Sequence, residues 1–179
     1  MEFKPTMHRQ PIIGDARCAL YSIANLLGDM GILLMNNVNE STNYLQERRF
    51  LERWHEAGRA LTGRVGNVIC DIYPFAIAAP GQRVTLDQDT LNGLQPDPGN
   101  YILALIDFAR NDGAHTVGCL WGSGEDCILL DPQHAFPVPI EKAYLFKAFE
   151  VVGVRWLTSD SGQPPEFNKQ DLSHIFNLD

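Results

Sequence analysis

Three residues of this chain, Cys18, His115 and Asp131, have the types that catalysis by a thiol requires. Such catalysis needs a nucleophilic thiol, an imidazole that takes the thiol proton, and an acid or amide that orients the imidazole. Cys18 lies at the start of a predicted helix over 16–27, with Asp15 as an acceptable N-cap three residues ahead. In the first turn of a helix, unpaired backbone N–H groups and the positive end of the helix dipole favour a thiolate.

The other two residues lie at the two ends of a predicted β-hairpin. His115 opens the apolar run 115–121, and Asp131 closes the run 126–131. The segment 122–125 between them contains Gly and Ser and is typical of a tight turn. Because the strands of a hairpin run antiparallel, its open end is expected to bring His115 and Asp131 together.

Each of these residues also has an ordinary structural alternative. Cys18 is compatible with a small buried residue, His115 with a strand-end histidine bonded to a loop carbonyl, and Asp131 with a turn opener before proline. His134 is close enough to Asp131 in the chain to compete as the base. The three remaining cysteines lie among apolar residues and are expected to fill the core: Cys70, Cys119 and Cys127.

The pattern of predicted elements indicates an α+β fold in which helices come first and an antiparallel sheet follows. Apolar residues at 20, 23, 24 and 27 give the first helix its buried face. The further predicted elements are a short strand at 10–13, helices at 43–61, 67–79 and 141–149, and strands at 101–106, 115–121, 126–131 and 151–157. We expect one domain over 1–158 and a polar, loosely ordered tail over 159–179.

The segments around the three residues resemble the papain-like cysteine peptidase superfamily. A His that opens one strand (115–122) and an Asp-Pro that closes the next (128–132) are similar to the C39-type peptidases, which trim leader peptides. The segment 18–27 is similar, more weakly, to Josephin-type and OTU-type deubiquitinases. The resemblance covers 1–30 and 100–157. It implies a papain-like cysteine protease fold, with N-terminal helices packed on a C-terminal antiparallel sheet.

This resemblance implies a role for each residue. Cys18 would attack a carbonyl carbon as thiolate, His115 would hold and later donate the proton, and Asp131 would orient the ring. Gln10 would stabilise the developing oxyanion together with the backbone N–H of Cys18. Two positions depart from the C39 pattern: Gln10 lies eight residues before Cys18 rather than about six, and Ala19 replaces the glycine that usually follows the nucleophile.

The expected function is therefore a cysteine-dependent hydrolase of a peptide or isopeptide bond, C39-like or deubiquitinase-like. The same triad serves deamidation, transglutamination and acyl transfer, because only the acyl acceptor differs. A second alternative is a papain-like domain that binds a partner without catalysis, which Ala19 and the shifted Gln10 favour. A third is an α+β module of unrelated fold, in which Cys18 and His115 would lie far apart.

The composition indicates one globular domain and limits the classes of partner that the protein is expected to bind. The chain has 179 residues, of which 45% are hydrophobic and 20% charged. A net charge of -8 without a basic patch argues against nucleic acid and is compatible with a protein or peptide substrate, including a basic ubiquitin-like modifier. The cysteine spacing fits no zinc site, and we expect no cofactor. With neither a signal peptide nor a membrane span, the expected location is cytoplasmic, in the producing cell or in a host to which the protein is delivered.

Overall fold

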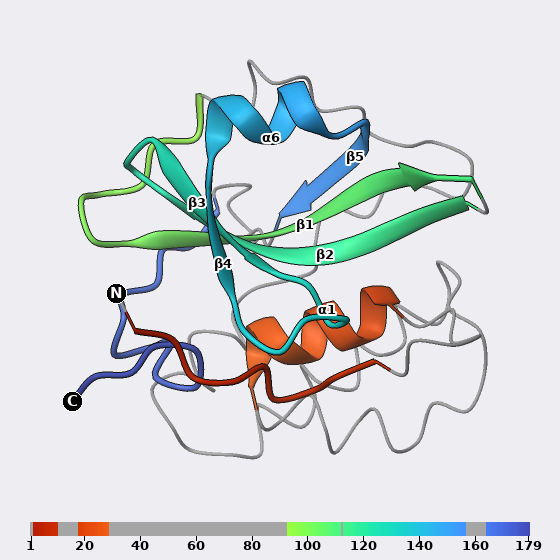
Figure 1. Ribbon diagram of the computed structural model, residues 1–179. Coiled ribbons are helices and arrows are strands. Elements are labelled where there is room, and N and C mark those ends of the chain that lie inside the picture. The colour runs from red at the N-terminus through yellow and green to blue at the C-terminus, as the bar shows by residue number, and fades with distance from the viewer. Residues whose placement is uncertain (1, 11–17, 29–92, 112, 157–163) are drawn as a thin grey trace.

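A five-stranded antiparallel sheet forms the centre of the computed structural model, which describes residues 2–10, 18–28, 93–111, 113–156 and 164–179 (Figure 1). The strands, in the spatial order β4-β3-β2-β1-β5, are β1 (Tyr101–Arg110), β2 (Gly113–Gly122), β3 (Asp126–Leu130), β4 (Val138–Glu141) and β5 (Val151–Trp156). Helix α1 (Cys18–Leu27) packs on one face and helix α6 (Lys142–Ala148) lies on the other. This arrangement is α+β, as the sequence predicts.

Both faces of the sheet are buried, which explains why β1 begins with a continuous apolar run. Alternate residues of a strand point to opposite faces. Leu103 and Leu105 therefore enter the layer beneath α1, whereas Ile102 and Ile106 enter the layer beneath α6. Trp121 anchors the second layer, because its ring is fully buried and its indole N–H donates to the Leu94 carbonyl at 3.1 Å.

Helix α1 places Cys18 at its first position and is held by polar as well as apolar contacts. Of the apolar face predicted at 20, 23, 24 and 27, Ile23 and Ala24 are buried as expected. Ser22 and Asn25 are also buried on this helix, and both make hydrogen bonds to backbone outside it. Gly28 ends the helix with a φ of 80°, which is the left-handed conformation that favours glycine after a last helical turn.

The predicted elements of the second half agree with the structure, with one addition. The predicted strands correspond to β1, β2, β3 and β5, and the helix predicted at 141–149 corresponds to α6. The sequence does not predict β4, because Pro137 and Pro139 argue against a strand. Proline is tolerated there because β4 is at the edge of the sheet and pairs only with β3.

The C-terminal segment differs from the loosely ordered polar tail that the sequence predicts. Within its described part, 164–179, four apolar side chains are buried in the α1 layer: Phe167, Leu172, Ile175 and Phe176. The backbone of Phe167 pairs with that of Tyr101 at the start of β1, through hydrogen bonds of 2.8 and 2.9 Å. This part of the segment therefore belongs to the core.

Several predictions fall outside the described residues: Asp15, Cys70, residues 11–13 of the strand at 10–13, and the helices at 43–61 and 67–79. Among the residues that the structure does describe, no helix combines the length and the apolar character needed to cross a membrane.

Candidate active site

The open end of the β2–β3 hairpin brings His115 and Asp131 together, as its two-strand pattern predicts. Gly118 pairs with Leu130, so Asp131 follows the last ladder pair and His115 lies three residues beyond it on the other strand. The His115 Nε2 and Asp131 Oδ1 atoms are 2.8 Å apart. The His115 side chain is 5% exposed and the Asp131 side chain 20% exposed, so solvent screens this pair only weakly.

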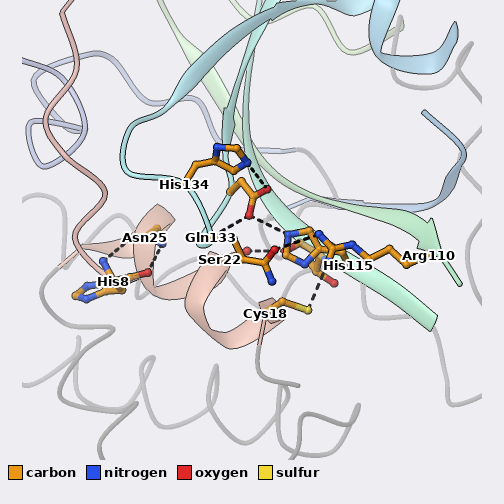
Figure 2. Close-up of polar contacts among 10 residues, drawn as sticks. His8, Cys18, Ser22, Asn25, Arg110, His115, Gln133 and His134 are labelled. Carbon is orange, nitrogen blue, oxygen red and sulfur yellow. Dashed lines mark hydrogen bonds and ion pairs between the residues drawn. The ribbon is translucent and has the colours of Figure 1, made fainter. Parts of the chain in front are cut away.

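Cys18 reaches the same place because β3 ends before β2 does. Beyond Gly118, the edge of β2 is covered by the first turns of α1 instead of by β3. There the Thr116 N–H donates to the Cys18 sulfur at 3.4 Å, and one turn later the Ser22 hydroxyl donates to the Thr116 carbonyl at 3.0 Å. Figure 2 shows Cys18 at the start of α1, directed toward β2, the strand that carries His115.

The environment of Cys18 favours the thiolate. Burial of the sulfur raises the pKa of this thiol, but the hydrogen bond and charge of His115 and the hydrogen bond of the Thr116 N–H lower it by more. The net result is a pKa below the ordinary value of 9.0. The side chain is also partly exposed, which a nucleophile that meets a substrate must be.

His115 is correspondingly held as imidazolium. Burial lowers the pKa of its ring, but the hydrogen bonds to Asp131 and Cys18 and the charge of Asp131 raise it to about 9. For the Asp131 carboxyl, burial acts in the other direction and raises the pKa. The hydrogen bond to His115 outweighs this effect, and the pKa of Asp131 lies below its ordinary value. The three shifts together favour a thiolate–imidazolium–carboxylate arrangement near neutral pH.

The ring nitrogens of His115 have separate partners. Because Nε2 is held by Asp131, Nδ1 is the nitrogen left to exchange a proton with Cys18. An imidazole fixed on one side by a carboxylate and facing a thiol on the other is the arrangement that general-base activation of a nucleophile requires.

Residues around Asp131 fix its carboxylate. The Gln133 N–H donates to Asp131 Oδ1 at 2.9 Å, and the Arg110 guanidinium donates to the Gln133 side-chain carbonyl at 3.1 Å. His134, the competing base, places Nε2 3.5 Å from Asp131 Oδ2, but its side chain is 65% exposed. Only His115 of the two histidines interacts with Cys18, so it is the better candidate for the base.

Gln10 lies beside the site through its backbone. Its N–H donates to the carbonyl of Pro132, the residue that follows Asp131, at 2.9 Å, and its side chain is buried. His8, two residues before Gln10, is bound by the Asn25 side chain. The His8 N–H donates to the Asn25 side-chain carbonyl at 2.9 Å, and the Asn25 side-chain N–H donates to the His8 carbonyl at 3.0 Å. The N-terminal segment is thus tied to both α1 and the Asp131 loop, and the oxyanion role of Gln10 stays a prediction.

The structure bears on two expectations from the sequence. The separation of Cys18 and His115 that the third alternative implies is not observed, because the two side chains interact. Cys119 and Cys127 are buried in the α6 layer, as expected of core residues.

Sequence reasoning did not single out Ser22 and Thr116, although both contact Cys18 or the strand beside it. Ser22 follows Cys18 by four residues, so helical spacing puts the two on one face. Thr116 directly follows His115. A polar residue four positions after a helical candidate, or directly after a candidate on a strand, is therefore the signal that could have found them.

Comparison of the chain with protein-family models, with curated proteins and with solved structures gave no match. In the described part of the chain, no group of three or more His, Cys, Asp or Glu side chains could hold a metal ion.

Proposed function

We propose that this protein is a papain-like, cysteine-dependent hydrolase that cleaves a peptide or isopeptide bond. One observation carries the proposal: a helix-borne thiol with a lowered pKa interacts with an imidazole whose other nitrogen binds a carboxylate at 2.8 Å. The order of the residues and the sheet that follows the first helix are those of the papain-like superfamily that the sequence resembles.

The chemistry follows from these contacts. The Cys18 sulfur adds to the substrate carbonyl carbon, and the negative charge moves to the carbonyl oxygen, next to the N-terminus of α1. His115 then gives its proton to the amide nitrogen, the C–N bond breaks as the carbonyl re-forms, and the acyl group stays on the sulfur as a thioester. In the second half-reaction His115 removes a proton from water, the hydroxide attacks the acyl carbon, and the thiolate leaves.

Deamidation and acyl transfer share the first half-reaction, so the proposed test reads out both the bond broken and the acceptor. Wild-type protein and Cys18→Ala are incubated with a proteome-derived peptide library and with ubiquitin-like proteins, and the products are identified by mass spectrometry. We expect new peptide termini with the wild type and none with Cys18→Ala. Glutamine-to-glutamate conversion or amine transfer in place of cleavage would redirect the proposal to deamidase or acyltransferase chemistry. Identical spectra for the two proteins would contradict it.

A further inference from the structure

Asp107 is a carboxylate on the α1 face of the sheet that the triad does not use. It follows Leu103 and Leu105 in the same alternating row of β1, and both of those residues are fully buried. The pairing of β1 with β5 shifts register between Asp107 and Phe108. At Gly153 on β5, a Cβ atom would lie 3.2 Å from Asp107 Oδ2. A bulge and a glycine thus make room for this charge, and bulges are common next to active sites.

Asp107 binds Thr116, the residue beside Cys18. The Thr116 hydroxyl donates to Asp107 Oδ1 at 2.6 Å, the Thr116 N–H donates to the Cys18 sulfur at 3.4 Å, and the Thr116 carbonyl accepts from Ser22 at 3.0 Å. Thr116 is 6% exposed, and these three hydrogen bonds give its N–H, its carbonyl and its hydroxyl each a partner.

Thr116 and Asp107 lie on the opposite face of the sheet from His115. His115 alternates with Val117 and Cys119 toward α6, whereas Thr116 alternates with Leu120 toward α1. Cys18 therefore lies beside β2, beyond the end of β3, with His115 and Asp131 on one face of the sheet and Thr116 and Asp107 on the other.

We propose that Asp107 and Ser22 position Thr116, and that Thr116 in turn holds its N–H on the Cys18 sulfur and so favours the thiolate. The hydroxyl bond fixes the side chain of Thr116 and the Ser22 bond fixes its carbonyl, which leaves its peptide N–H little freedom to turn from the sulfur. A donor directed at a thiolate stabilises the charged form. This inference rests on the proposed function, because it concerns the reactivity of the same thiol.

The test compares the pH dependence of iodoacetamide labelling at Cys18 in five proteins: wild type, His115→Ala, Thr116→Val, Thr116→Ser and Ser22→Ala. Labelling is followed by peptide mass spectrometry, and the melting temperature of each variant is recorded. Thr116→Val keeps the shape of the side chain and removes its hydroxyl. We define the labelling midpoint as the pH at which the labelling rate of Cys18 is half of its maximum. We expect Thr116→Val and Ser22→Ala each to raise this midpoint by roughly half to one pH unit, which means a three- to tenfold loss of labelling rate at a pH well below the midpoint. Thr116→Ser should restore the wild-type midpoint.

A core variant separates positioning from loss of stability. Ile175→Val removes one buried methyl group from the C-terminal segment, lowers the melting temperature and should leave the midpoint unchanged. A wild-type midpoint in folded Thr116→Val, with a raised midpoint in His115→Ala, would overturn this inference and leave the proposed function standing. If Thr116→Val does not fold, Ser22→Ala decides in the same way. A wild-type Cys18 that labels like an ordinary thiol would overturn both.

Discussion

At the scale of single residues, the charge state of Cys18 depends on two opposing effects. Burial favours the thiol, whereas His115 and Thr116 favour the thiolate, and the second effect is larger. His115 can supply this stabilisation because Asp131 holds its far nitrogen and, together with Cys18, raises its pKa to about 9. The reactivity of the sulfur therefore depends on a carboxylate that does not touch it.

Replacing Asp131 by Asn tests this dependence. Asn keeps an oxygen near His115 Nε2 but removes the charge, so the pKa of His115 should fall and that of Cys18 should rise. A hydrogen bond to a charged group is typically worth about 1.5–3 kcal/mol, and Asn weakens this bond without removing it, so we expect the alkylation midpoint of Cys18 to rise by about one pH unit. Asp126→Asn, at an exposed carboxylate of β3, serves as the control. An unchanged midpoint in Asp131→Asn would show that Asp131 does not act through the imidazole.

The pH dependence of stability is a second residue-scale prediction. His115 binds more protons when folded, so its contribution to stability is complete below pH 6.5 and is lost as pH rises toward 9. Cys18 binds fewer protons when folded, so its contribution has the opposite slope as pH approaches 9.0. In the wild type these slopes oppose each other.

In Cys18→Ser only the histidine slope remains. Because Cys18 also helps to raise the pKa of His115, the upper end of this slope lies below pH 9 in the variant, and its melting temperature should fall more steeply than that of the wild type as pH first rises above 6.5. Parallel melting curves for the two proteins across this range would argue against the thiolate–imidazolium pair.

At the scale of elements, the site lies where the N-terminus of α1 packs against the open end of the β2–β3 hairpin. The sequence predicts this part well, because the His115 strand and the Asp131 strand are apolar runs separated by a recognisable turn. The positioning of α1 is less predictable. Ser22 and Asn25 are polar residues in a helix, and nothing in the local pattern says that distant backbone, at Thr116 and His8, will bind them.

Asn25 is expected to be the stronger structural anchor of the two. Its side chain satisfies both backbone groups of His8, which is itself buried. Asn25→Ala would leave an N–H and a carbonyl without this partner, and we expect it to lower the free energy of unfolding by about 2–4 kcal/mol. Urea unfolding measures the change. Ser173→Ala, at an exposed position, should stay within about 0.5 kcal/mol of the wild type. An Asn25→Ala protein as stable as this control would contradict the anchoring role.

At the scale of the whole molecule, the two ends of the described chain complete the α1 layer. Phe3 forms a bridge with Phe176, and the ring of Phe176 also packs against Tyr101, with centroids 5.7 and 5.4 Å apart respectively. The sequence did not predict this because the apolar residues of the last segment are separated by many polar ones. Burial against β1, a long way back in the chain, cannot be read from local composition.

Truncating the buried ring tests the contribution of this segment. Phe176→Ala should lower the free energy of unfolding by about 3–5 kcal/mol, since Phe176 is 1% exposed. Leu178→Ala, two residues later and 48% exposed, should change it by less than about 0.5 kcal/mol. Urea denaturation compares the two, and equal midpoints would mean that the last segment does not belong to the core.

The measurement that tests the central claim most directly is the rate of iodoacetamide labelling at pH 6, mapped to each cysteine by peptide mass spectrometry, in wild type and His115→Ala. An ordinary thiol with a pKa near 8.5 reacts slowly at this pH. We predict fast labelling of Cys18 alone in the wild type and loss of that rate in His115→Ala. Labelling of Cys18 no faster than that of the other cysteines would contradict the account, and the protein would then be a binding or structural domain.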